Sequence, residues 1–133
     1  MKGKIMECPE GLRYTKEHEW TREEENIVTI GITDYAQGEL GDVVYVELPD
    51  EGMAVNAGEP FGVVESVKSV SDLYSPISGT VVEANARLND EPEVVNGSPY
   101  NDGWLMKVEC ADKSELDKLM TADEYMEFVK SLG

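Results

Sequence analysis

An internal repeat constrains the fold of this chain more than any other sequence feature. Residues 41–44 (Gly-Asp-Val-Val) match residues 79–82 (Gly-Thr-Val-Val), and residues 55–61 match residues 95–100 at a similar spacing. Each copy is followed by a run rich in β-branched or aromatic residues, which is typical of a strand. We therefore expect a mainly β fold, a pseudo-twofold sandwich of two similar β-units that a hairpin joins.

The joining hairpin is predicted at residues 63–76, where two β-rich runs flank a single lysine, Lys68. No Asn-Gly or Asp-Gly pair marks the tip, so turn chemistry alone does not explain the lysine. Glu65 precedes Lys68 by three residues and Asp72 follows it by four, which puts one acid on each flanking run. Taken alone, such a lysine is most often solvated surface, and a purely structural β-module stays open at this point.

The residues around Lys68 resemble the lipoylation hairpin of the glycine cleavage system H protein family. The resemblance rests on Glu-Ser-Val-Lys-Ser-Val-Ser-Asp at residues 65–72, followed by Ser-Pro-Ile-Ser-Gly at residues 75–79. A lysine in a hairpin is a weak signal, but further motifs in the family's order make the match specific. These motifs extend it from about Leu12 to the C-terminus and lie at residues 14–20, 31–37, 40–49 and 99–105.

The resemblance implies a barrel-sandwich hybrid, the fold of lipoyl- and biotinyl-carrying domains, with short C-terminal helices. It also implies that Lys68 carries lipoic acid in amide linkage, and that a lipoylating enzyme recognises Glu65 and the hairpin backbone. The lysine and lipoyl chain together would reach on the order of 12–14 Å from the backbone. Glu19, which the family places along a cleft near the arm, and Asp72 are expected to dock the loaded arm. Trp20 is either an apolar wall of that cleft or part of the core.

The partners that the resemblance implies supply the chemistry. A pyridoxal-phosphate glycine decarboxylase would load an aminomethyl group onto the arm. A tetrahydrofolate-dependent aminomethyltransferase would take the one-carbon unit and free ammonia, and a flavin-linked dihydrolipoyl dehydrogenase would reoxidise the dithiol. The residues themselves favour a carrier over an enzyme, because His18 is the only histidine and no nucleophile motif stands beside a second base. No zinc, calcium or phosphate-binding motif is present.

The net charge of the chain also restricts the classes of partner that it can bind. The 133 residues include 11 basic and 28 acidic side chains, a net charge of −17, which disfavours nucleic acids and anionic membranes. Partners with basic docking surfaces are favoured, although the charge can equally serve solubility. No apolar run is long enough to span a bilayer. We expect a monomer in a reducing bacterial or archaeal cytoplasm, or in the mitochondrial matrix if the chain is a mature eukaryotic one.

Domain limits and strands follow from local signals. Residues 1–11 are expected to form a short flexible extension, because they match neither a signal peptide nor an organelle-targeting pattern. Residues 12–133 form a single carrier domain, with helices from about residue 113. Alternating β-branched residues predict strands at residues 27–32 and 42–48.

Helices are predicted where capping residues stand before helical spacing. Thr33 begins a short helical turn that Gly38 is expected to close. Two capping-box patterns predict C-terminal helices at residues 113–120 and 122–131 that cover part of the sandwich. The patterns are formed by Asp112 with Glu115 and by Thr121 with Glu124.

Two other carrier functions stay open. Biotin carriers also display a lysine on a β-hairpin, but they usually flank it with methionines, where this chain has Val67 and Ser69. A related lipoyl carrier that serves lipoyl relay or sulfur-compound oxidation is harder to separate by sequence. The motifs at residues 14–20 and 103–105 favour glycine cleavage.

Overall fold

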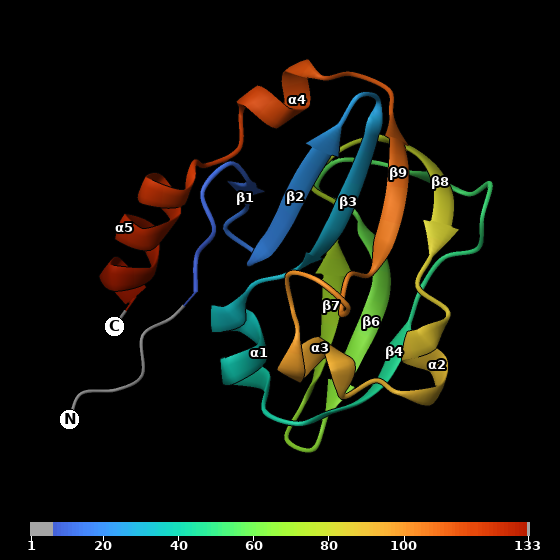
Figure 1. The fold of residues 1–133 in the computed structure, drawn as a ribbon, viewed down its shortest axis with the longest axis vertical. Coiled ribbons are helices and arrows are strands. Elements are labelled where there is room, and N and C mark those ends of the chain that lie inside the picture. Colours follow the sequence, from blue (N-terminus) through green and yellow to red (C-terminus); the bar gives the residue numbers. More distant parts are fainter. Residues whose placement is uncertain (1–6, 133) are drawn as a thin grey trace.

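The computed structural model describes residues 7–132 and shows a mainly β protein with short helices (Figure 1). The strands are β1 (Arg13–Tyr14), β2 (Glu19–Glu24), β3 (Ile27–Ile32), β4 (Val43–Glu47), β5 (Ala54–Val55), β6 (Pro60–Ser66), β7 (Val70–Tyr74), β8 (Gly79–Ala84) and β9 (Met106–Cys110). The helices are α1 (Asp34–Leu40), α2 (Arg87–Asp90), α3 (Val94–Gly97), α4 (Ser114–Asp117) and α5 (Ala122–Leu132). The predicted fold class is confirmed.

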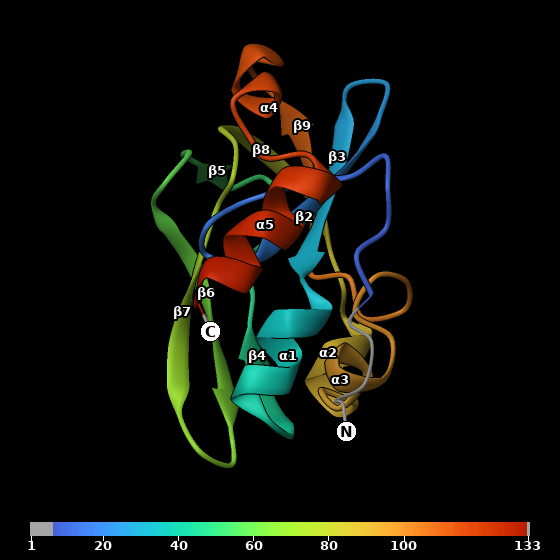
Figure 2. The same ribbon diagram turned by 90° about the vertical axis from the view of Figure 1, so that its left-hand side faces the viewer.

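The strands form two antiparallel sheets. One has six strands in the order β1-β2-β3-β9-β8-β5, and the other has three in the order β4-β6-β7. The predicted hairpin is β6–β7, in the smaller sheet, and its tip projects at the end of the molecule where α1 ends (Figures 1 and 2). Phe61 of β6 packs against two separate groups of buried side chains, so the base of the hairpin is tied into the core.

The first part of the sequence repeat reappears as a shared irregularity in two strand pairs. The β4–β6 ladder shifts register between Val43 and Tyr45, and the β8–β9 ladder shifts between Val81 and Glu83. The extra residues, Val44 and Val82, occupy matching positions of the repeat, and both are exposed. A bulge adds local twist and turns side chains outward, so matching bulges give the two β-units the same local shape.

The second part of the repeat has a different local structure in each copy, so the similarity predicted there is wrong. Val55 ends strand β5, whereas Val95 lies inside helix α3. Residues 94–97 turn helically because the backbone N–H groups of Val94 and Val95 reach the carbonyls of Glu91 and Pro92. Val95 is fully buried by this turn. The similar residues of the two copies therefore bury an apolar side chain in two different backbone conformations, a strand and a helical turn.

Trp20 belongs to the core. Its side chain is fully buried, and its indole N–H donates to the carbonyl of Pro99 at 3.0 Å. The ring lies against Gly31 on the neighbouring strand, where a Cβ would come within 2.6 Å of it. Of the two readings for Trp20, the structure supports the core.

Helix α1 begins as predicted and ends later than predicted. The hydroxyl of Thr33 accepts a hydrogen bond from the N–H of Ala36 and caps the helix. The helix passes through Gly38 and stops at Leu40, because Gly41 takes a left-handed φ of 78° and its N–H bonds to the carbonyl of Gln37. The predicted stop at Gly38 is therefore wrong by one turn.

One of the two predicted capping boxes is confirmed. The N–H of Thr121 donates to the carboxylate of Glu124 at 2.9 Å, and the N–H of Glu124 donates back to the Thr121 hydroxyl at 3.3 Å. These reciprocal bonds open α5, which lies against β1 and the described start of the chain (Figure 1).

The other box is wrong, and the helix predicted at residues 113–120 is shorter than predicted. Glu115 does not reach back to Asp112; its carboxylate accepts from the N–H and the hydroxyl of Ser78. Helix α4 ends at Asp117 because Met120 exchanges both backbone hydrogen bonds with Tyr14, at 2.8 and 2.9 Å. Within residues 7–132, no helix is long and apolar enough to cross a membrane.

Part of the predicted N-terminal extension can be described. Residues 1–6 lie outside the described part of the chain. The N–H of Glu7 donates to the carboxylate of Asp34 at 2.9 Å, and its carbonyl accepts from the hydroxyl of Tyr100 at 2.8 Å. The thiol of Cys8 contacts the carbonyl of Ala122 at 3.6 Å. Residues 7 and 8 thus bond to three segments that are distant in sequence.

Candidate functional site

The tip of the β6–β7 hairpin holds its shape without glycine. The N–H of Ser66 donates to the carbonyl of Ser69 at 2.8 Å and closes the turn. The Ser66 hydroxyl oxygen accepts from the N–H groups of Lys68, at 3.2 Å, and Ser69, at 3.1 Å. A serine side chain therefore satisfies the turn donors that a glycine-containing turn would bond through its backbone. The result is a fixed turn with an exposed Lys68.

The tip rests on the connection between α1 and β4. The N–H of Val67 donates to the carbonyl of Asp42 at 3.0 Å. The aliphatic part of Lys68 lies over Gly41, where a Cβ would be 3.5 Å from Cε and 3.8 Å from Cγ and Cδ. The lysine stem therefore leans toward the C-terminal end of α1 rather than straight into solvent.

Asn96, on α3, holds that connection in place. Its amide group donates to the Gly41 carbonyl at 2.8 Å and to the side-chain oxygen of Gln37 at 3.1 Å. Its side-chain oxygen accepts from the N–H of Val43 at 2.8 Å. No local sequence signal distinguishes Asn96. Only its pairing with residues more than 50 positions away reveals the role.

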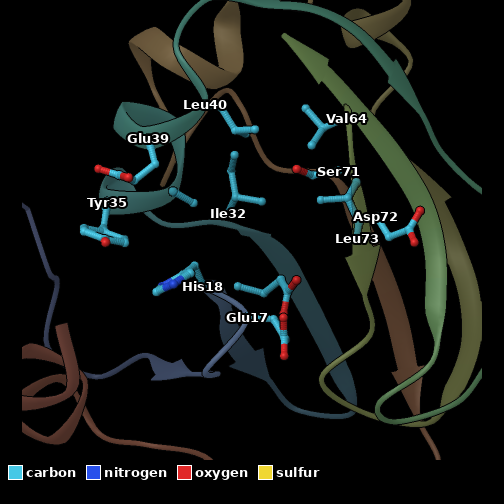
Figure 3. A pocket seen from close by; sticks show the side chains of 12 residues that line it. Glu17, His18, Ile32, Tyr35, Glu39, Leu40, Val64, Ser71, Asp72 and Leu73 are labelled. Atoms are coloured by element: carbon cyan, nitrogen blue, oxygen red, sulfur yellow. The ribbon is translucent and has the colours of Figure 1, made fainter. Parts of the chain in front are cut away.

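A cleft of about 300 Å³ opens between α1 and the β7 edge of the smaller sheet (Figure 3). Its apolar side chains come from β3, α1 and the hairpin, and its polar ones from the turn before β2, the start of β2, α1 and β7. The lining residues are Glu17, His18, Glu19, Ile32, Tyr35, Ala36, Glu39, Leu40, Val64, Ser71, Asp72 and Leu73. Leu40 directly precedes Gly41, so the cleft begins beside the residue on which the Lys68 stem lies.

Glu19 is a buried acid of this cleft. The side chain is only 2% exposed; its carboxylate accepts from the Thr15 hydroxyl at 2.7 Å and from the N–H of Tyr74 at 3.2 Å. Burial raises the pKa of Glu19 to about 8, although the hydrogen bonds from Thr15 and Tyr74 oppose the shift. Near neutral pH the carboxyl is therefore mostly protonated. A cation in the cleft would favour its ionised form.

The other two predicted acids face the outer side of the hairpin. Glu65 stands opposite Val70, and Asp72 stands opposite Val63. Asp72 alternates with Ser71 and Leu73, which face the cleft, and its carboxylate points away from the cleft in Figure 3. The structure thus brings Glu19 to the cleft wall, places Asp72 at the cleft's rim and leaves Glu65 at the tip.

His18 forms part of the wall of the cleft and takes part in a buried hydrogen-bond network. Its Nδ1 lies 2.8 Å from the hydroxyl of Tyr125, which lies 2.7 Å from the Thr33 hydroxyl. Burial lowers the pKa of His18, against the opposing influence of Glu17 and Glu39. These contacts explain a structural role for the single histidine. Among residues 7–132, no group of three or more His, Cys, Asp or Glu side chains is arranged to hold a metal ion.

Comparisons with known proteins show the family of the chain. The family model described as glycine cleavage H-protein matches residues 12–132. The chain belongs to the glycine cleavage H-protein family. The family prediction is confirmed, and with it the prediction that the chain is a lipoyl carrier of glycine cleavage. None of these matches favours a biotin carrier.

Individual relatives cover nearly the whole chain. It is 58% identical over 124 residues to the glycine cleavage system H protein of Staphylococcus haemolyticus, covering 93% of this chain and 98% of that one. It is 63% identical over 120 residues to the H protein of Geobacillus kaustophilus, covering 90% and 94%. The crystal structure of an H protein from Mycobacterium marinum matches with a TM-score of 0.84 and 41% identity, covering 90% and 96%.

The residues present fit a lipoyl group. Lys68 is exposed, and its stem lies over a glycine that leaves room beside the entrance of the cleft. Ile32, Leu40 and Val64 give the cleft an apolar wall suited to an acyl chain that ends in a dithiolane ring.

Proposed function

We propose that this chain is the lipoyl carrier of a glycine cleavage system, with lipoic acid attached through an amide to Nζ of Lys68. One observation supports this most: Lys68 stands exposed at a fixed turn, and its stem lies over Gly41, next to Leu40 of the adjacent cleft. The position offers an amine that an enzyme can reach and a surface on which the attached chain can lie.

In this function the chain presents the attached lipoyl group, and its partners catalyse the reactions. A bound lipoyl group accepts a one-carbon amine and two electrons. We propose glycine decarboxylase, the aminomethyltransferase, dihydrolipoyl dehydrogenase and a lipoylating enzyme as partners, in the cytoplasm of a bacterium. The chain itself is not an enzyme in this proposal. The fixed turn supports it, because a preordered lysine avoids the entropy cost of ordering a loop in each partner's site.

Two acids are proposed to act on the loaded arm and one on its attachment. Glu19, at the cleft wall, would hold the cationic amine of the loaded arm, and Asp72 would add a weaker attraction from the rim. Glu65, next to the tip, would be recognised by the lipoylating enzyme. The burial of Glu19 supports its part, because an ion pair formed away from water is screened least.

The test is the intact mass of the protein produced with lipoate and a lipoylating enzyme. We expect one lipoyl increment on wild type, none on Lys68→Arg, and an unchanged increment on the exposed control Lys118→Arg. An increment that survives in Lys68→Arg would place the modification elsewhere. Lipoylated protein that glycine decarboxylase cannot use would instead indicate a carrier of another pathway.

A further inference from the structure

Helix α5 lies outside the cleft but bonds to its wall. Among residues 7–132, the side chains that line the cleft come from the turn before β2 and from β2, β3, α1, β6 and β7, and none comes from α5. Tyr125, on α5, is nevertheless fully buried, and its hydroxyl lies 2.8 Å from Nδ1 of His18 in the cleft wall. One buried hydroxyl thus connects α5 to the cleft.

This hydroxyl has two hydrogen-bonding neighbours. The second is the hydroxyl of Thr33 at 2.7 Å, and the Thr33 oxygen also accepts from the N–H of Ala36. Burial raises the pKa of Tyr125 well above its ordinary value, so the hydroxyl keeps its proton. It therefore donates to one neighbour and accepts from the other. Removing the hydroxyl leaves Nδ1 of His18 without the partner that the fold gives it.

Aromatic packing holds the same imidazole ring. Its centroid lies 4.7 Å from the ring of Tyr35 on α1, and the two side chains are neighbours in Figure 3. The rings of Tyr125 and Phe128, both on α5, have centroids 5.8 and 5.9 Å away. These separations are favourable for aromatic pairs. Two of the three rings around His18 therefore belong to α5.

The backbone of His18 needs such support. Its φ is 71°, in the left-handed region that few residues other than glycine adopt. A residue in this region persists where the surrounding structure fixes it. The N–H of His18 donates to the carbonyl of Thr15 at 3.1 Å, and its carbonyl accepts from the N–H of Thr33 at 3.0 Å. The ring contacts and these two bonds together hold a tight turn at residues 15–19.

That turn sets the position of the Glu19 carboxylate. The Thr15 hydroxyl oxygen accepts from the N–H of Glu19 at 3.1 Å, and the hydroxyl donates to the Glu19 carboxylate at 2.7 Å. The other carboxylate oxygen accepts from the N–H of Tyr74 at 3.2 Å. Thr15 can make both of its bonds only while the turn at His18 brings it back to Glu19.

We propose that Tyr125 is a positioning residue for the loaded arm: its hydroxyl holds the His18 ring, and the ring holds the turn that aims Glu19 into the cleft. This inference rests on the proposed function, which gives Glu19 the task of binding the cationic amine. It goes beyond that function because it gives α5, which does not line the cleft, a part in holding the arm.

The test removes one buried hydroxyl at a time. Tyr125→Phe deletes the bond to His18 and keeps the buried ring. Tyr14→Phe is the matched control, because Tyr14 is equally buried and stacks on Tyr125 at 4.8 Å, but its hydroxyl donates to the carbonyl of Pro9. Phe128→Leu loosens the His18 ring through packing alone, and it replaces Tyr125→Phe if that variant does not fold. Thermal unfolding checks the fold of each variant.

The first measurement needs no lipoyl group. Carbon NMR of the apo protein, labelled at its glutamate carboxyl carbons, follows the ionisation of Glu19, and Glu19→Gln identifies its signal. Burial raises the pKa of Glu19 to about 8 in the wild-type fold. A loosened turn gives the carboxyl access to water, so its pKa should fall by at least about one unit in Tyr125→Phe. Tyr14→Phe should leave this pKa unchanged.

The second measurement is the release of ammonia from the isolated loaded protein. Tyr125→Phe should speed this release at least about twofold, because contacting residues of one network are usually coupled by that much or more. Tyr14→Phe should leave it unchanged. In a Glu19→Gln background, Tyr125→Phe should add nothing, because both changes act through the same carboxylate. A purely structural role for Tyr125 predicts additive effects instead.

Three results would overturn the inference: an unchanged Glu19 pKa in Tyr125→Phe, an equal pKa shift in Tyr14→Phe, or a full effect of Tyr125→Phe in the Glu19→Gln background. A wild-type protein that gains no lipoyl on Lys68 would refute the proposed function itself. The titration of Glu19 in the apo protein is independent of that result, so the two failures can be told apart.

Discussion

The side chain of Lys68 lies over Gly41, so that a Cβ on Gly41 would be 3.5 Å from Cε of the lysine. Gly41 also ends α1, with φ 78° and ψ −160°, a conformation that essentially only glycine adopts. One glycine thus does two things: it turns the chain from α1 into β4, and it forms the surface over which the stem of the proposed attachment lysine lies.

Gly41→Ala should therefore affect both stability and modification. A side chain in this conformation costs about 1–3 kcal/mol in the free energy of unfolding, and a shift of the strained connection moves the surface on which the Lys68 stem lies. We expect a lower urea midpoint and slower lipoylation. Gly38→Ala is the matched control: Gly38 lies inside α1 with nothing within 4 Å of its Cβ position, so alanine should stabilise the helix. Equal stability of the two variants would contradict this account.

Local sequence signals predict the hairpin and the start of each capped helix well. β-Branched runs on both sides of Lys68 form β6 and β7, and Thr33 and Thr121 cap helices as their positions indicate. These features depend on residues within a few positions of one another. The resemblance adds the fold class, which periodicity alone leaves broad.

Features set by distant partners could not be predicted in the same way. Met120 leaves a helical pattern because it pairs with Tyr14, and Glu115 leaves its capping box because Ser78 offers two donors. Glu19 looks like a surface acid in sequence but is buried against Tyr74 of β7. In each case a long-range contact outweighs a local preference that is worth about 1 kcal/mol or less.

We expect Asn96 to contribute more to the free energy of unfolding than a half-buried asparagine usually does. Asn96→Ala leaves the Val43 N–H and the Gly41 carbonyl without their partner, which should cost about 1–3 kcal/mol in the free energy of unfolding. Because Gly41 supports the Lys68 stem, lipoylation should slow as well. Urea unfolding and a lipoylation time course measure both effects. The exposed Asn101→Ala serves as control, and similar losses in the two variants would argue against a specific role for Asn96.

The buried Glu19 predicts a pH dependence of stability. Its pKa is about 8 in the folded protein against 4.5 for the ordinary group, so the folded state binds more protons between these values. Stability should therefore fall as pH rises from about 5 to 8, by up to about 5 kcal/mol from this group. Glu19→Gln keeps the shape without the titration and should flatten the profile. Equal pH profiles of thermal unfolding for the two proteins would show that Glu19 ionises normally.

The net charge of −17 predicts that salt slows partner association. Raising ionic strength from about 0.02 to about 0.5 M shortens the Debye length from roughly 20 Å to about 4 Å. Stopped-flow association rates with glycine decarboxylase should fall markedly over this range, while dissociation rates change less. Association rates that do not respond to salt would leave solubility as the only role for the charge.

The two acids proposed to hold the loaded arm should differ in importance. Glu19 is 2% exposed and lines the cleft, so a cationic amine that reaches it leaves bulk water. The Asp72 carboxylate is exposed and points away from the cleft, so water screens its attraction. Glu19→Gln should therefore speed the hydrolytic release of formaldehyde and ammonia from the isolated loaded protein several-fold, and Asp72→Asn should do so less. Ammonia release over time measures both, with lipoylation unchanged. Equal decay in wild type and the double variant would show that neither acid protects the arm.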